Sequence, residues 1–213
     1  AYLSQKARKM LDEAGWPECQ ISVSNSLDER LIQNLFLQGA QIDMFGVGER
    51  MITAKSEPVF GGVYKLTAVE NDKGEIIPKI KCSENVEKIT IPHFKKVYRL
   101  YNRDNDKAIA DYMTVHDEVV DENEPLMLFD PYATWKTKNV CNFEARELLV
   151  PVFLNGKKVY QSPTLKDIQA YCKQQVNTLW DEIKRFDNPQ TYYVDLSQKL
   201  WDIQQELLRK NRN

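Results

Sequence analysis

Apolar side chains recur at helical spacing near the start of the chain, and short apolar runs follow each helical segment. Spacings of three and four residues place apolar side chains on one face of a helix, whereas short apolar runs between Gly and Pro are typical of strands. The pattern predicts helices over residues 2–14 and 26–38, and strands over residues 19–24 and 41–45. This alternation is typical of a parallel α/β sheet or barrel.

Two local signals set the expected ends of these helices. Gly15 stands where a left-handed C-cap belongs, because glycine adopts positive φ without steric cost. Ser26 followed by Glu29 matches a capping box, in which the Ser26 hydroxyl accepts from an amide and the Glu29 carboxylate accepts from the Ser26 amide. The second helix is therefore expected to begin at Ser26.

The pattern changes after Gly62, where β-rich segments replace the alternation. Turn residues predict hairpins around Asn71–Gly74 and Asn102–Asp106, and Asn155–Gly156 suits a type I′ turn. The acidic stretch 117–124 is expected to be a solvated loop. The last fifty residues predict a helix that is capped by Ser162 and continues to Phe186, then a final helix from about Leu196.

Composition narrows the class of protein. The 213 residues carry a net charge of −2, which argues against a polybasic nucleic-acid surface. No apolar run approaches the roughly 20 residues of a membrane helix, so we expect no membrane partner. The four cysteines form no CxxC pair. We expect buried or half-buried free thiols in a reducing, cytoplasmic compartment.

The sharpest chemical signal is Phe45-Gly46-Val47-Gly48, where a predicted strand runs directly into Gly-x-Gly. Amides in such a turn can point at an anion, and the missing side chains allow phosphate oxygens to approach. Asn25 follows the preceding strand, so two strand ends would form one rim. A plain tight turn at the glycines and a capping loop around Asn25 remain the alternatives.

The order of these segments resembles nicotinate phosphoribosyltransferase. The resemblance covers the whole chain but about the C-terminal half of that family's length. It is carried by the segments ISVSNSLDE, QGAQIDMFGVGERMITA, PVFGGVYKL, KIKCSENVEKITIP and LLVPVFLNGKKVY. It implies part of an irregular type II phosphoribosyltransferase α/β barrel over residues 1–62, followed by a mixed α+β C-terminal domain over residues 63–213.

The resemblance also implies an activity. The family makes nicotinate mononucleotide from nicotinate and 5-phosphoribosyl-1-pyrophosphate in NAD biosynthesis, using Mg²⁺ and ATP, and such an ATP-coupled enzyme is classed as a ligase or glycosyltransferase. It is usually a homodimer with shared active sites. Carried over to this sequence, Asn25 and the amides of Gly46, Val47 and Gly48 would hold the phosphate end of the phosphoribosyl substrate.

One departure from the family pattern and one gap at the start of the chain bear on this site. Glu49 stands where the family commonly has a threonine that contacts substrate, and a carboxylate beside a phosphate is unfavourable unless it turns away or meets Mg²⁺. The family's Asp-Ser-Gly-Asp segment would end immediately before Ala1, with the phosphohistidine and the nicotinate-binding arginine further upstream. The resemblance therefore implies no catalytic residue in these 213 residues, which would be inactive alone.

Two other functions stay open at this point. A related phosphoribosyltransferase that acts on nicotinamide or quinolinate would use a similar phosphate rim, and the residues that choose the base would lie upstream of Ala1. A non-catalytic binding or oligomerisation domain would use the hairpins and long helices as an assembly surface.

Overall fold

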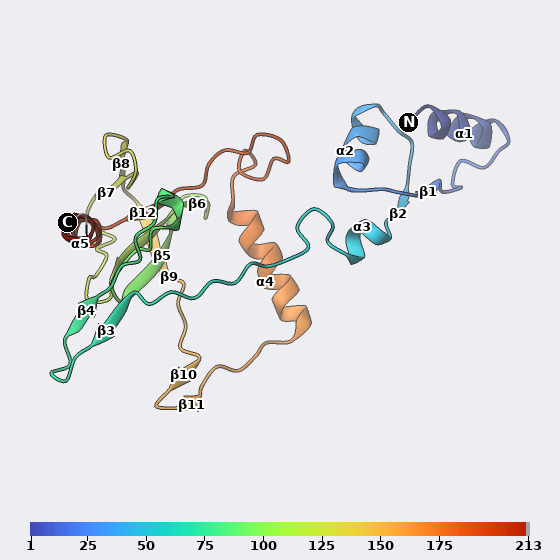
Figure 1. Ribbon diagram of the computed structural model, residues 1–213. Coiled ribbons are helices and arrows are strands. Elements are labelled where there is room, and N and C mark those ends of the chain that lie inside the picture. Colours follow the sequence, from blue (N-terminus) through green and yellow to red (C-terminus); the bar gives the residue numbers. More distant parts are fainter. Residues whose placement is uncertain (212–213) are drawn as a thin grey trace. The chain divides into compact units, whose positions relative to one another are not determined.

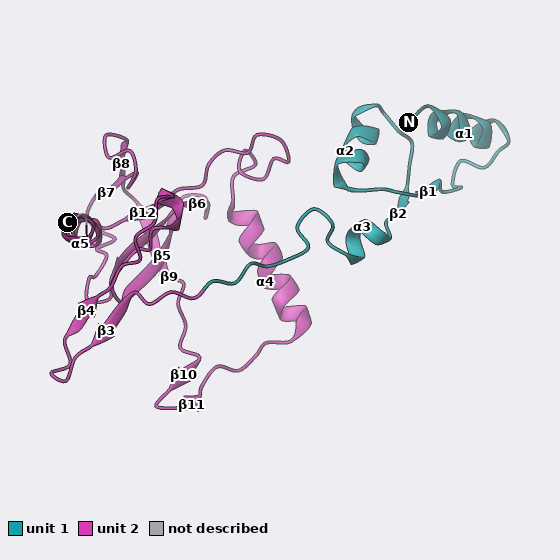
Figure 2. Ribbon diagram, in the orientation of Figure 1, with its two compact units in different colours: residues 1–63 teal, residues 64–213 magenta. Residues whose placement is uncertain are grey.

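Helices and short strands alternate along the first 63 residues of the computed structural model, which describes residues 1–211. The first compact unit is Ala1–Val63 and the second is Tyr64–Asn213, one residue from the predicted domain boundary (Figure 2). The elements of the first unit are α1 (Tyr2–Glu13), β1 (Ser22–Ser24), α2 (Glu29–Leu37), β2 (Met44–Gly46) and α3 (Glu49–Ile52) (Figure 1).

The strands β1 and β2 pair in parallel, as the alternation predicts, with Val23 opposite Phe45. Each is shorter than its predicted run. Phe45 also packs edge-on against Phe36 of α2, with ring centroids 5.4 Å apart. Helix α1 is tied to the chain after α2 because the Gln5 amide donates to the carbonyl oxygens of Gln38 and Gly39. The short sheet thus packs against α2, and α1 is linked to the residues that end α2.

The end of α1 lies where the sequence predicts it, whereas the start of α2 does not. Gly15 has φ +83°, and the Trp16 amide donates to the Leu11 carbonyl, which is the expected left-handed C-cap. The prediction for α2 was wrong, because Asp28 is the N-cap and accepts from the Leu31 amide at 2.8 Å. Ser26 instead has φ +53° and lies in the turn before the helix.

The second unit is built on a four-stranded sheet. Its strand order is β12 (Val194–Leu196), β6 (Ala108–Val115), β5 (Lys95–Asn102) and β9 (Phe143–Glu147). The predicted β5–β6 hairpin is confirmed as an antiparallel pair, whereas β12 joins β6 in parallel. The strands β9 and β12 were not predicted, because neither stands beside its partner in sequence.

Three small hairpins and two long helices complete this unit. The hairpins are β3 (Ala68–Glu70) with β4 (Ile76–Pro78), β7 (Leu126–Phe129) with β8 (Thr137–Val140), and β10 (Phe153–Leu154) with β11 (Lys157–Lys158). The other elements are η1 (Val86–Lys88), α4 (Leu165–Thr178) and α5 (Gln198–Lys210). Positive φ angles of 49° at Asn155 and 75° at Gly156 agree with the predicted type I′ turn.

Each face of the sheet buries its own apolar cluster. One cluster gathers side chains from the central strands, the β7–β8 hairpin and β9: Tyr98, Leu100, Ala110, Tyr112, Leu128, Val140 and Phe143. The other joins Val115 of β6 and Leu196 of β12 to Leu200 of α5. Because successive residues of a strand point to opposite faces, Tyr112 and Val115 belong to different clusters.

The segment after Thr178 is not helical, although the apolar stripe predicts a helix to Phe186. The Lys107 ammonium donates to the carbonyl oxygens of Asn177 and Leu179, and the Trp180 indole donates to the Ala108 carbonyl. These contacts with the β5–β6 turn satisfy the last carbonyls of α4 and end the helix. Its N-cap is Thr164 rather than Ser162.

Two further expectations differ from the structure. The acidic stretch 117–124 is only partly a solvated loop, because Glu118 accepts from the Val115 amide and the Ser197 hydroxyl while Glu122 pairs with Arg103. All four cysteines are free but exposed, and not buried. No helix within residues 1–211 is both long enough and apolar enough to cross a membrane.

The cap of α2 gives a first prediction. Asp28→Ala leaves the Leu31 amide without its acceptor and should lower the free energy of unfolding of the intact protein by about 1 kcal/mol. Asp28→Asn keeps an acceptor of the same shape and should cost only a few tenths of that value. Urea unfolding measures both variants, and an equal loss would show that the cap is not what Asp28 contributes.

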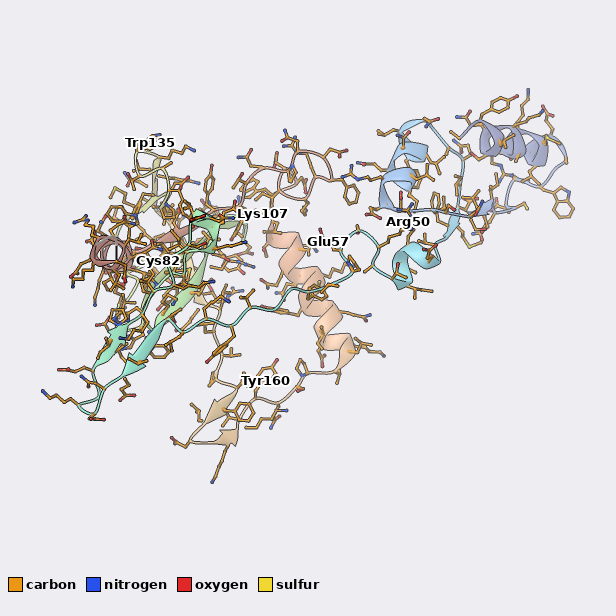
Figure 3. The ribbon with its side chains drawn as sticks, viewed as in Figure 1. Arg50, Glu57, Cys82, Lys107, Trp135 and Tyr160 are labelled. Carbon is orange, nitrogen blue, oxygen red and sulfur yellow. The ribbon has the colours of Figure 1, made fainter. Side chains whose placement is uncertain are left out.

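The core of the second unit gives a second prediction. Phe143 is fully buried, so Phe143→Ala should cost about 3–5 kcal/mol in urea unfolding, since it removes apolar contact and leaves a cavity. The matched control is Trp135→Ala at the tip of the β7–β8 hairpin, where the side chain is 78% exposed (Figure 3). That control should stay within about 0.5 kcal/mol of the unchanged protein.

Candidate functional site

The ends of β1 and β2 lie beside each other, because Ser24 pairs with Gly46 in the parallel register. The turns that follow, at Asn25 and at Val47–Gly48, therefore leave the same edge of the sheet. They border a pocket of about 410 Å³, called here the strand-end pocket. Its lining residues are Asn25, Ser26, Leu27, Gly46, Gly48, Glu49, Arg50 and Lys55.

Gly46 is required by the close approach of the two strands. A Cβ atom built on Gly46 would lie 3.0 Å from the Ser24 Cβ and 3.7 Å from the Val23 carbonyl oxygen. That first distance is at the limit of what packed carbon atoms tolerate, so any side chain would push the two strand ends apart. The small residue thus keeps both turns on one pocket.

The first turn has an unusual backbone. Asn25 has φ +88° and Ser26 has φ +53°, in the left-handed region that asparagine enters more readily than most residues. The Ser26 hydroxyl lies 3.4 Å from the Asn25 side-chain oxygen, to which it donates. This conformation turns the chain sharply after β1, so that Asn25 lines the pocket instead of continuing the strand.

The second turn offers backbone donors. The amides of Val47 and Gly48 donate no hydrogen bond to any residue in the described part of the chain, 1–211. The Gly48 carbonyl accepts from the Met51 and Ile52 amides and so begins α3. Unpaired amides next to a polar pocket are suited to bind an oxyanion.

Two ion pairs border the strand-end pocket. The Arg50 guanidinium lies 3.3 Å from the Asp28 carboxylate, and the Lys55 ammonium lies 3.4 Å from the Glu49 carboxylate. Arg50 extends from α3 (Figure 3). The Glu49 and Lys55 side chains are at least half exposed, so their pairing is weak and Lys55 can turn to an incoming anion.

The structure brings together four of the five residues predicted for the site. Asn25, Gly46, Gly48 and Glu49 line the strand-end pocket, whereas Val47 does not, although its amide belongs to the same turn. Lys55 also lines the pocket but was not predicted. It follows α3 by three residues, and the turn in which the Lys55 amide donates to the Arg50 carbonyl brings its ammonium to Glu49.

A metal centre is not formed by these residues alone. Within residues 1–211, no group of three or more His, Cys, Asp and Glu side chains is arranged to hold a metal ion. Glu49, the one carboxylate that lines the strand-end pocket, pairs with Lys55. The Mg²⁺ that the resemblance implies therefore has no complete ligand set in the described chain.

Proteins with similar sequences carry the same name. A Bacillus subtilis protein named nicotinate phosphoribosyltransferase is 46% identical over 94% of this chain and 41% of its own length. One of that name from Dictyostelium discoideum is 29% identical over 95% of this chain and 36% of its own length. The chain thus spans about two fifths of the length of these relatives.

A solved structure shares the fold. The crystal structure of human nicotinic acid phosphoribosyltransferase matches with a TM-score of 0.68 at 22% identity, over 97% of this chain and 38% of that chain. Residues 94–204, slightly more than half of the chain, match the family described as nicotinate phosphoribosyltransferase C-terminal domain. The chain therefore belongs to the nicotinate phosphoribosyltransferase family and corresponds to its C-terminal region.

Proposed function

We propose that this chain is part of an enzyme that joins nicotinate to 5-phosphoribosyl-1-pyrophosphate, forming nicotinate mononucleotide and pyrophosphate for NAD biosynthesis. The observation that carries the proposal is the Ser24–Gly46 pairing, which brings Asn25 and the Gly46–Gly48 turn to one pocket. The names of the relatives support the choice of nicotinate as the acceptor. The proposed role of this chain in the reaction is to bind the phosphate at the 5-position of the ribose.

The strand-end pocket has the donors for that task. The Val47 and Gly48 amides have no competing acceptor within residues 1–211, and the Asn25 amide group can add another donor. Arg50 and Lys55 supply positive charge from the border of the pocket. A phosphate would draw Lys55 away from Glu49, whose exposed carboxylate can then turn to solvent, because hydrogen bonds to a charged oxyanion are stronger than an exposed ion pair.

An exposed apolar face on α1 supports the proposal that residues 1–62 form part of a larger barrel. Helix α1 has its predicted apolar stripe, yet Leu3 is 75% exposed and Met10 is 61% exposed. An apolar face of this kind is stable when another element covers it. We propose that the remaining strands and helices of an irregular α/β barrel provide that cover in the whole enzyme.

Binding at this pocket would contribute to catalysis by position and charge. Glycosyl transfer from a pyrophosphorylated ribose develops positive charge on the sugar as pyrophosphate leaves, and a fixed 5-phosphate orients the ribose for that step. None of the described residues is proposed to react with substrate, so residues 1–213 alone would be inactive. ATP coupling, Mg²⁺, a homodimer and a cytoplasmic location are our proposals for the whole enzyme.

The proposal predicts a kinetic defect for Gly46→Val in the intact enzyme. The added side chain would separate the ends of β1 and β2 and displace the Gly46–Gly48 turn from the phosphate. We expect the apparent KM for 5-phosphoribosyl-1-pyrophosphate to rise on the order of tenfold to a hundredfold, with a smaller change in the KM for nicotinate. Steady-state kinetics with each substrate varied in turn measures both values.

A control variant creates a valine elsewhere in the first unit by adding two methyl groups to an alanine. Ala14→Val changes an exposed residue at the end of α1, and both KM values should remain within about twofold of the unchanged enzyme. If a folded Gly46→Val enzyme had the same KM for the phosphoribosyl substrate as the control, the turn would have no part in binding it.

The charges at the pocket border predict opposite effects for two neighbours. Glu49→Gln removes repulsion toward the phosphate and should lower the apparent KM for the phosphoribosyl substrate by about two- to fivefold. Lys55→Gln removes attraction and should raise that KM by a similar factor of about two to five. Both effects should shrink at high salt, because the side chains are exposed. KM changes of the same sign in both variants would contradict the assignment.

The identity of the base needs a separate experiment. The intact protein should form product from nicotinate and 5-phosphoribosyl-1-pyrophosphate, and much less from nicotinamide or quinolinate at equal concentrations. Release of pyrophosphate reports each reaction. Turnover with nicotinamide or quinolinate in preference to nicotinate would retain the phosphate pocket but overturn the proposed substrate, while no turnover and no binding of 5-phosphoribosyl-1-pyrophosphate would favour a non-catalytic domain.

A further inference from the structure

A hollow of about 160 Å³ lies in the second unit, between the β7–β8 hairpin and strands β6 and β12. Its walls are mainly apolar, and Ile109, Leu128 and Phe129 contribute to them. A cavity of roughly 150 Å³ lined by apolar side chains can hold one benzene ring. We call this feature the Asp195 hollow, after the acidic residue that faces it.

Asp195 is an acidic residue of this sheet that is almost completely buried. The residue is only 5% exposed, although it carries a carboxylate. It lies between Val194 and Leu196 in β12, and the alternation of strand residues turns it away from the Leu196–Leu200 cluster. It therefore lines the hollow on the opposite face of the sheet.

The Asp195 carboxylate has no protein partner. Throughout residues 1–211, no side chain or amide donates a hydrogen bond to it, and no cation lies within ion-pair distance. A largely buried carboxylate without a protein donor is costly, because only the solvent that reaches it can replace part of the lost hydration. A ligand that brings a donor into the hollow would remove that cost.

The neighbouring carboxylate is already satisfied. Asp130 accepts from the Tyr132 and Ala133 amides at 2.8 and 3.1 Å, and its other oxygen lies 4.0 Å from the Lys136 ammonium. Lys138 also lines the hollow but is exposed and makes no ion pair within the described residues. With Asp130 engaged, two acidic residues are too few for a metal ion, and Asp195 is the carboxylate of the hollow that accepts from no donor within the described residues.

We propose that the Asp195 hollow binds a small organic cation, in which a protonated nitrogen donates to the Asp195 carboxylate and a ring-sized apolar body packs on Ile109, Leu128 and Phe129. The amine supplies both the missing donor and a compensating charge, and the apolar walls exclude water from the pair. The site is formed entirely within residues 64–213 and does not depend on the proposed transferase activity.

The binding of the cation is also expected to depend on pH. Burial, and secondarily the charge of Asp130, raise the pKa of Asp195 to about 6. Below that pH the carboxyl group is neutral and loses its attraction for the cation, so binding should strengthen as the pH rises from about 5 to about 7. The other ionisable groups around Asp195 are Asp130, Lys136, Lys138 and Tyr193, together with Tyr112, whose pKa burial raises to about 12.

The test uses benzylamine, which is protonated at neutral pH, and benzyl alcohol, which has a similar shape but no charge. Isothermal titration calorimetry of the intact protein at pH 7.5 should show saturable binding of benzylamine, and binding of the alcohol weaker by about tenfold or more, since a hydrogen bond to a charged group is worth more than a neutral one. At pH 5 the affinity for benzylamine should fall by about tenfold.

Two variants separate the site from the rest of the protein. Asp195→Asn keeps the shape of the side chain and removes its charge, so it should weaken benzylamine binding by about tenfold or more and abolish the dependence on pH. Asp72→Asn, an exposed change in the β3–β4 turn, should leave the affinity unchanged. Absence of saturable binding, equal affinity for amine and alcohol, or unchanged affinity in Asp195→Asn would each overturn the proposal, and the comparison of the two ligands stands even if that variant fails to fold.

Discussion

The parallel pairing of β1 with β2 is the constraint on which the candidate phosphate site depends. Three residue pairs fix the register, and the last of them, Ser24 with Gly46, determines which turns share an edge. A shift by one residue would turn every side chain of one strand to the other face. The glycine allows this approach, and its position at the strand end also starts the turn that leaves two amides unpaired. One residue type thus serves both the packing and the proposed chemistry.

The second unit follows a different rule, since its sheet separates two apolar clusters, and each strand residue belongs to one face or the other. In β12 this alternation assigns Leu196 to the α5 side and leaves Asp195 on the side of the β7–β8 hairpin. A carboxylate in such a position does not help the fold, because it loses most of its hydration and gains no partner within the described residues. Proteins tolerate local costs of this kind mainly where a site requires them, which is why Asp195 points to a ligand.

Local sequence signals determined much of the secondary structure. The stripe over residues 2–14 and the glycine that ends it produced α1 and its left-handed cap, because both depend on neighbours a few residues apart. The Asn155–Gly156 turn and the β5–β6 pair also formed as predicted, since each joins strands that are adjacent in sequence. The same local reading identified Gly46 and Gly48 as the special backbone of the first unit, and four of the five predicted site residues line one pocket.

Tertiary contacts decided the rest. Strands β9 and β12 are short and acquire their partners from distant segments, so no local pattern marks them. The end of α4 depends on Lys107, which is 70 residues from Asn177, and the acidic stretch 117–124 is held in part by Arg103 and Ser197. The sequence by itself determined which segments turn, coil or extend, because those preferences are local. Only the tertiary structure decided which distant groups meet, such as Ser197 with Glu118, because the hydrophobic burial that assembles the segments is not directional.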